Sequence, residues 1–124
     1  MIIYISLILL FISCSAKWIM DTLKFHYDKS FWKNLKYQDY FNPILSWDNK
    51  YLRYIKRSKI IKWLMENPLV FLTDFYHLMQ FIHLNGYMLV IALNIGSDWL
   101  SRLIIFVIIR LIYSITGLIF YKNK

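Results

Sequence analysis

Residues 69–95 read LVFLTDFYHLMQFIHLNGYMLVIALNI, and residues 99–121 read WLSRLIIFVIIRLIYSITGLIFY. Hydrocarbon offers the backbone no hydrogen-bond partners, so such apolar stretches cross a bilayer only as helices or as strands of a closed barrel. Both stretches are too long and too continuous for barrel strands. Between them, residues 94–98 (NIGSD) suit a tight turn, in which Gly96 ends one helix and a serine or aspartate caps the next. The two stretches therefore predict a helical hairpin in a membrane.

A third apolar stretch occupies residues 1–20, MIIYISLILLFISCSAKWIM. Its uninterrupted apolar part, residues 2–16, is about 22 Å long as a helix, which is short of the roughly 30 Å hydrocarbon core. Trp18 and its apolar neighbours complete the crossing if the Lys17 side chain extends to the interface. We therefore interpret residues 1–20 as an uncleaved first span.

Two alternatives to an uncleaved first span stay open. A cleaved signal peptide normally begins with a basic residue, and none precedes this apolar run. A lipoprotein signal would attach lipid to Cys14 within residues 11–14 (FISC), although the position three before the cysteine is usually Leu. This cysteine is the only one in the chain, which excludes an intramolecular disulfide framework and a cysteine-based zinc site.

The composition of the whole chain agrees with a membrane protein. Of its 124 residues, 59% are hydrophobic, the mean hydropathy is +0.44 and the net charge is +8. A chain of this length is expected to form one domain. Residues 1–124 are therefore predicted to be a single all-helical integral membrane domain with about three transmembrane helices. No cofactor is expected, because the three glycines form no phosphate-binding loop.

Residues 21–68 are predicted to be a cytoplasmic or interfacial loop with short helices. Residues 17–68 hold eleven of the fifteen basic residues. Basic residues beside spans stay in the cytoplasm, which predicts a multi-pass protein of the cell membrane with its N-terminus outside and its C-terminus inside. Aromatic residues interleave with the basic ones, a mixture that favours anionic lipid headgroups over nucleic acid as the partner.

Polar residues in the predicted second span lie on one helical face. Thr73, Asp74, His77 and Gln80 fall within a sector of about 120°, and His83 lies about 60° further round. Ionisable groups at membrane depth are costly and are functional hypotheses by default. Asp74 and His77 can touch, and a carboxylate that orients an imidazole suits a proton relay or a general base. They are the candidate catalytic residues. The alternative is that the stripe only joins helices.

Arg110 is a second charged residue at predicted membrane depth. It lies near the middle of the third predicted span. In an antiparallel hairpin it would be level with Gln80. Its expected partners are therefore Gln80, a headgroup phosphate or, with a longer reach, Asp74.

The histidines do not predict a metal site. His77 and His83 are six residues apart and point to different faces, unlike the i, i+4 pair of a helical zinc site. His26 would have to fold back from the loop. We expect no bound metal.

Two stretches of the chain resemble a group of known proteins: residues 41–51, FNPILSWDNKY, and residues 70–78, VFLTDFYHL. They are similar to the pattern W-N-P-x-x-S-W-x-N-K-Y followed by F-x-T-D-x-x-H of uncharacterised small membrane proteins from Bacteroides-type bacteria and their phages. Phe41 stands where that pattern has Trp. The group has no known activity to carry over. The resemblance implies one constellation at the mouth of the second span, formed by Asn42, Ser46, Trp47, Asn49, Lys50, Asp74 and His77.

Three functions are open at this point. The first is a non-catalytic membrane component or accessory subunit, acting with a protein partner or as a homo-oligomer. The second is a membrane-boundary enzyme or a proton- or ion-handling protein, which predicts a water-accessible cavity at Asp74 and His77 with Asn49 or Lys50 nearby. The third is a phage-encoded holin-like or envelope protein. The candidate binding residues are Asn42, Ser46, Trp47, Asn49, Lys50, Thr73, Gln80 and Arg110.

Overall fold

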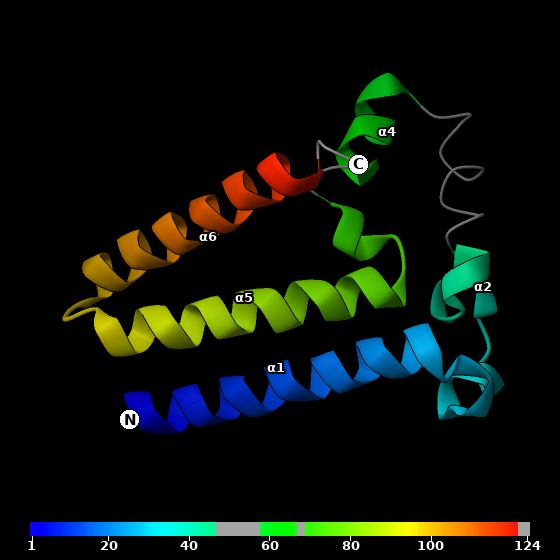
Figure 1. Ribbon diagram of the computed structural model, residues 1–124, viewed down its shortest axis with the longest axis horizontal. Helices are drawn as coiled ribbons and strands as arrows, with labels where there is room; N and C mark the ends of the chain where they lie inside the picture. Colours follow the sequence, from blue (N-terminus) through cyan, green and yellow to red (C-terminus); the bar gives the residue numbers. More distant parts are fainter. Residues whose placement is uncertain (47–57, 67–68, 122–124) are drawn as a thin grey trace. The chain divides into compact units, whose positions relative to one another are not determined.

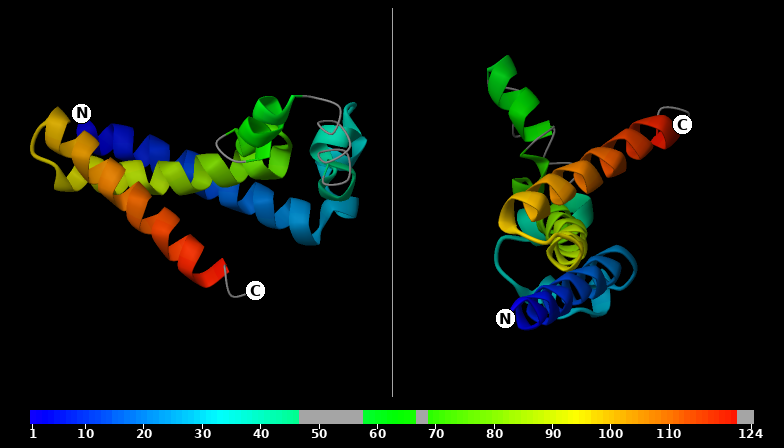
Figure 2. Two further views of the ribbon diagram at one scale, coloured as in Figure 1. Left: turned by 90° about the horizontal axis from the view of Figure 1, so that it is seen from above. Right: turned by 90° about the vertical axis from the view of Figure 1, so that its left-hand side faces the viewer.

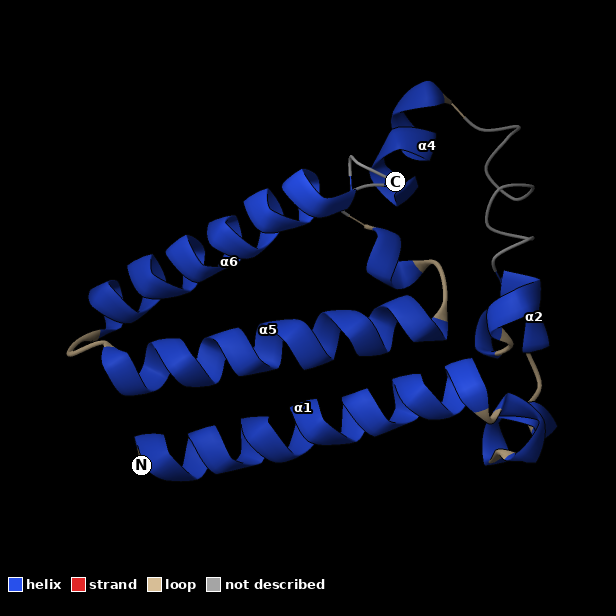
Figure 3. Ribbon diagram, viewed as in Figure 1, coloured by secondary structure: helices blue, strands red, loops and turns tan. Residues whose placement is uncertain are grey.

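The computed structural model describes residues 1–46, 58–66 and 69–121, and these residues form helices joined by short loops (Figure 1, Figure 3). Three helices are long and apolar enough to cross a membrane: α1 (Ile2–Phe25), α5 (Phe75–Ile95) and α6 (Trp99–Tyr121). No strand occurs in the described ranges. The predicted fold class, all-helical with about three candidate spans, is confirmed.

Short helices lie between α1 and α5, as predicted for this loop. They are η1 (Tyr27–Lys29), η2 (Phe31–Asn34), α2 (Gln38–Phe41), α4 (Lys59–Glu66) and η3 (Val70–Leu72). A further helical turn covers residues 43–46. Asn42 caps this turn, because its Oδ1 accepts the N–H of Ile44 at 3.0 Å. Pro43 suits the first helical position, where a backbone N–H would have no helical partner.

The helix α1 extends past the predicted end of the first span at residue 20 and stops at Phe25. The Lys17 ammonium lies 2.6 Å from Asp21 Oδ1, one turn further along the helix. The Thr22 hydroxyl donates to the Trp18 carbonyl at 2.9 Å, which satisfies this polar side chain within the helix. Local polar pairs therefore let the helix continue beyond its apolar part.

The helix α5 begins at Phe75 and not at residue 69, so the predicted start of the second span is wrong. Asp74 sets this start, because its Oδ1 accepts the backbone N–H of His77 at 2.8 Å and its carbonyl accepts the N–H of Leu78 at 3.1 Å. The 21 residues of α5 span about 31 Å, which matches the hydrocarbon thickness without the excess length that a start at residue 69 implies.

The chain divides into two compact units. Unit 1 comprises Met1–Ser13 and Leu84–Lys124, and unit 2 comprises Cys14–His83. Within each unit, one half of α1 lies beside one half of α5 in antiparallel orientation (Figure 1, Figure 2).

In unit 1, small and polar residues bring α1 and α5 together. Asn94 Nδ2 donates to the Ser6 hydroxyl at 2.8 Å and to the Val90 carbonyl at 2.8 Å. A Cβ atom added to Gly86 would overlap the Ser13 hydroxyl and lie 3.1 Å from Ser13 Cβ. Small residues and interhelical hydrogen bonds are the usual means of helix association in membranes, where burial of apolar surface gives no driving force.

Gly86→Leu is expected to lower the stability of the protein by about 1–3 kcal/mol, the usual cost of overpacking a tight contact. The measurement is the thermal unfolding midpoint of the full chain in detergent micelles. Gly117→Leu is the matched control, because a Cβ at Gly117 meets nothing within 4 Å. Equal midpoints for the two variants would contradict the close approach of α1 and α5 at Gly86.

The turn between α5 and α6 forms as predicted, with Asp98 as the cap of α6. Its Oδ1 accepts the N–H of Ser101 at 2.7 Å, and its own N–H donates to the Ser101 hydroxyl at 3.1 Å. Hydrogen bonds from the Ser101 backbone and side chain lower the pKa of the Asp98 carboxyl. The Arg102 guanidinium donates to the Gly96 carbonyl at 3.2 Å and so satisfies one orphan carbonyl at the end of α5.

In unit 2, the core forms where the end of α1 meets the start of α5. Ala16, Met20 and Leu23 lie on one face of α1 and pack in one buried cluster with Phe75 and Met79 of α5. Their spacing of four and three residues is that of an apolar stripe on a helix. This cluster fixes the N-terminal end of α5 against the C-terminal end of α1.

Aromatic rings from the short helices complete this core. The ring centroids of Trp32 and Phe41 lie 4.7 Å and 5.0 Å from that of Phe75, and that of Tyr40 lies 6.2 Å from it. These separations fall in the range of favourable aromatic pairs. The loop therefore folds back onto the residue that follows the Asp74 cap.

Candidate functional site

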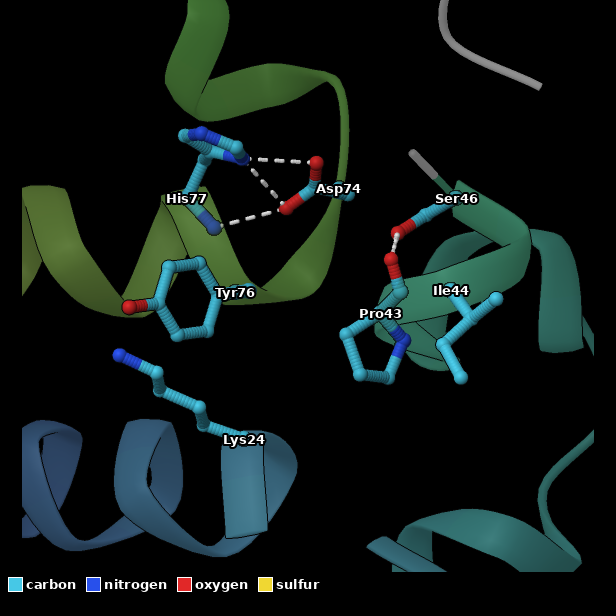
Figure 4. A pocket seen from close by; sticks show the side chains of 7 residues that line it. All are labelled: Lys24, Pro43, Ile44, Ser46, Asp74, Tyr76 and His77. Atoms are coloured by element: carbon cyan, nitrogen blue, oxygen red, sulfur yellow. Dashed lines mark hydrogen bonds and ion pairs between the residues drawn. The ribbon is translucent and has the colours of Figure 1, made fainter. Parts of the chain in front are cut away.

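A pocket of about 480 Å³ lies in unit 2 at the N-terminal end of α5 (Figure 4). Its walls come from three separate parts of the chain: the last turn of α1, the helical turn at residues 43–46, and the start of α5. The lining residues are Lys24, Pro43, Ile44, Ser46, Asp74, Tyr76 and His77. A volume of this size is within the range of small-molecule sites.

Asp74 is the most buried charged group of the pocket, with 2% of its surface exposed. As the cap of α5 it receives the His77 backbone N–H, and its negative charge lies at the positive end of the helix dipole. The cap therefore does two things at once. It starts the helix and holds a carboxylate in the pocket wall.

His77 is oriented by the same carboxylate. Its Nδ1 lies 2.8 Å from Asp74 Oδ1 and 2.7 Å from Oδ2. An ionised carboxylate only accepts hydrogen bonds, so Nδ1 carries the proton of this contact. The second ring nitrogen, Nε2, points away from Asp74 (Figure 4). The geometry is that of an imidazole held in one orientation with one nitrogen left to face another group.

Two tyrosines lie close to the pair. The Tyr76 ring meets the His77 ring edge to face, with centroids 5.7 Å apart. Burial raises the pKa of the Tyr40 phenol, and the negative charge of Asp74 raises it further. Tyr40 therefore remains a neutral phenol near this carboxylate over the whole physiological range.

Lys24 brings a positive charge to the pocket from α1. Its side chain is exposed, and its ammonium lies 5.2 Å from the centroid of the Phe25 ring on the same helix. Ser46 closes another wall. It is 3% exposed, and its hydroxyl donates to the Pro43 carbonyl over a long 3.4 Å.

The structure brings Ser46, Asp74 and His77, which the sequence singled out, to one pocket. Asn42 lies next to them as the cap of the turn that supplies Pro43 and Ile44. Asp74 and His77 line this pocket, which is part of the cavity that the enzyme or ion-handling hypothesis predicts. Of the other candidates, Trp47, Asn49 and Lys50 lie outside the described residues.

The prediction of one helical face for Thr73, Asp74, His77 and Gln80 is wrong for its first two members. Thr73 and Asp74 precede α5, so neither has a place on a helical face. Asp74 reaches His77 through the cap instead. Thr73 is buried at 3% exposure beside this cap, and Gln80 is half-buried on α5 without lining the pocket.

Arg110 belongs to α6 in unit 1, and the pocket residues belong to unit 2. Its guanidinium carbon lies 5.8 Å from the centroid of the Tyr113 ring on the same helix. The partners expected from the sequence, which are Gln80, a headgroup phosphate or Asp74, stay a prediction.

Lys24 and Tyr76 were missed as pocket residues. Lys24 follows Lys17 and Asp21 at helical spacing, which was a signal that α1 continues past residue 20 and carries this ammonium to the end of the helix. No local sequence pattern predicts that Tyr76 lines the pocket, because its position depends on where the Asp74 cap starts α5.

The pocket joins hydrogen-bond donors to an apolar wall. Lys24 offers a charged donor, and His77 Nε2 donates when the imidazole is protonated and accepts when it is neutral. The N-terminus of α5 adds its positive dipole, and Pro43 and Ile44 are apolar. Within the described ranges, no three His, Cys, Asp or Glu side chains gather as metal ligands would. The arrangement suits an anionic group attached to an apolar one.

Comparison of this chain with protein-family models, with curated proteins and with solved structures finds no match. The fold and the geometry of the pocket are therefore the observations from which a function is inferred.

Proposed function

We propose that this protein is a non-catalytic membrane component, an accessory subunit that holds the phosphate head of an amphiphile in the unit 2 pocket. One observation carries the proposal. Lys24 at the end of α1 and the Asp74–His77 pair at the start of α5 line the same pocket. Because both helices are long and apolar enough to cross a membrane, a pocket between these ends would open at the level of the headgroups.

The charges of the pocket favour a phosphate. The Lys24 ammonium supplies a point charge, and His77 Nε2, whose orientation Asp74 fixes, donates a hydrogen bond to the phosphate when the imidazole is protonated. The Asp74 carboxylate is balanced by the imidazole and by the helix dipole, so it opposes an incoming anion less than an isolated carboxylate would. Pro43 and Ile44 would contact the apolar part next to the phosphate.

The same proposal includes an orientation. The N-terminus lies outside, the basic loop and the C-terminus lie in the cytoplasm, and the pocket faces the inner leaflet. The charge distribution supports this, since eleven of the fifteen basic residues fall within residues 17–68. Anionic lipid of the cytoplasmic leaflet is attracted to such basic segments.

Lys24→Gln is expected to weaken retention of phosphatidylglycerol by about tenfold, the effect of losing one charge-assisted hydrogen bond. Native mass spectrometry of the full chain, purified from vesicles of defined composition, measures the bound lipid. Lys29→Gln is the matched control, because Lys29 is an exposed lysine of η1 that does not line the pocket.

Two comparison ligands identify the chemistry that the pocket recognises. Phosphatidylcholine of equal chain length tests for net negative charge, and soluble glycerol phosphate tests whether the apolar part contributes. We expect phosphatidylglycerol to be retained above both. Equal losses in Lys24→Gln and Lys29→Gln would leave only a general surface charge effect and would refute the pocket as a headgroup site.

A second function, proton handling or acid–base chemistry at the membrane boundary, is favoured by the contact of His77 Nδ1 with both Asp74 oxygens. Asp74→Asn separates the two proposals, since asparagine can cap α5 but cannot accept a proton as a carboxylate does. If the second function holds, proton flux or turnover in reconstituted vesicles falls in this variant while lipid retention persists.

A further inference from the structure

The helix α6 carries a charge at its centre. Its apolar stretch Trp99–Phe120 has no buried residue, and Arg110 lies midway along the helix, about 16 Å from Trp99 and from Tyr121. An arginine side chain is too short to bring its guanidinium to either interface from this position. A charge at the bilayer centre is costly to insert, so such a residue normally faces a partner.

Among the described residues, a weak cation–π contact offsets part of the cost of placing the Arg110 charge in hydrocarbon. Its guanidinium carbon lies 5.8 Å from the Tyr113 ring centroid, close to the limit of about 6 Å for a cation–π contact. Tyr113 is itself exposed on α6. The helix therefore presents a cation whose local contact balances little of its cost in hydrocarbon.

Two small residues, Ser114 and Gly117, follow this cation on the same helical face. Tyr113, Ser114 and Gly117 fall with Arg110 in a sector of about 100°, which we name the Arg110 face. A Cβ at Gly117 would meet nothing within 4 Å, and the Ser114 hydroxyl donates to the Arg110 carbonyl at 3.0 Å. The face is thus open next to the charge, and small residues let a second helix come close.

We propose that the Arg110 face docks a transmembrane helix of a different membrane protein, one that carries a carboxylate at mid-membrane depth. Charge complementarity selects this partner, because a carboxylate is the group that best balances a guanidinium in a low dielectric. A second copy fits poorly. α6 has no Asp or Glu between Trp99 and Tyr121, so two such faces would bring two arginines together. The proposal depends on α6 crossing the membrane and does not depend on the pocket of unit 2.

The test uses the full chain in vesicles with a model transmembrane peptide of leucine and alanine that has one central Asp. Energy transfer between labels on the protein and the peptide measures association. We expect the Asp peptide to associate at least about tenfold more tightly than the same peptide with Asn, since close charge pairs couple strongly.

Three variants locate the interaction. Arg110→Leu is expected to remove the preference for Asp, and Gly117→Leu to weaken association by blocking close approach. Arg102→Leu is expected to keep the preference, because this arginine lies near the start of α6. Equal binding of the two peptides, or a preference for Asp that survives Arg110→Leu, would overturn the proposal. So would energy transfer between two copies of the protein that disappears in Arg110→Leu.

Discussion

Asp74→Ala is expected to lower the free energy of unfolding by about 1.5–5 kcal/mol. The variant loses the cap of α5, which is worth about 0.5–2 kcal/mol, and leaves the half-buried His77 ring without its hydrogen-bond partner, which costs about 1–3 kcal/mol more. Denaturant or thermal unfolding of the full chain in detergent, followed by circular dichroism, measures the loss.

Two controls make this result specific to the cap and to the pair. Asp74→Asn keeps a capping side chain and is expected to lose clearly less stability than the alanine variant. Asp28→Ala removes a carboxylate that is 90% exposed and is expected to change stability little. If Asp74→Ala lowered the free energy of unfolding no more than Asp28→Ala does, this would contradict the capping role of Asp74.

Phe75→Ala is expected to cost about 3–5 kcal/mol, the range for deleting a buried phenylalanine ring. Phe75 is 8% exposed and joins the α1–α5 core to the loop, with the Trp32 ring centroid at 4.7 Å and that of Phe41 at 5.0 Å. Because Trp32 is one of these partners, tryptophan fluorescence follows the loss of packing together with the unfolding midpoint.

Phe120→Ala is the matched control, since Phe120 on α6 is 74% exposed. Phe75→Leu keeps an apolar side chain of smaller volume and is expected to fall between the two. A Phe75→Ala variant with the unfolding midpoint of Phe120→Ala would show that the aromatic loop does not pack on the start of α5.

Much of the fold follows from the length of the apolar stretches. The helix at residues 99–121 and the turn before it could be predicted without tertiary information, because a continuous apolar run and an Asp cap define a helix locally. The start of α5 was different. Residues 69–73 are apolar enough to continue a helix, but α5 starts after Asp74, whose Oδ1 accepts the His77 N–H.

The pocket was predictable in part. The spacing of Asp74 and His77 indicated that they touch, and their contact at 2.7–2.8 Å follows the cap rather than a shared helical face. Lys24 joins them through the packing of α1 on α5, which depends on the buried cluster that includes Leu23 and Phe75. Contacts between elements far apart in the chain leave no local sequence pattern. The wall that Lys24 forms at the end of α1 was therefore not predicted.

The headgroup pocket can be tested by mapping a photoreactive lipid onto the protein. A phosphatidylglycerol with a diazirine next to its phosphate is incorporated in vesicles with the full chain, and the labelled residues are identified by mass spectrometry after irradiation. We predict label on residues 43–46 and 74–77, reduced in Lys24→Gln but not in Lys29→Gln. Label confined to the lipid-exposed face of α6, with residues 43–46 and 74–77 unmodified, would contradict the proposed function.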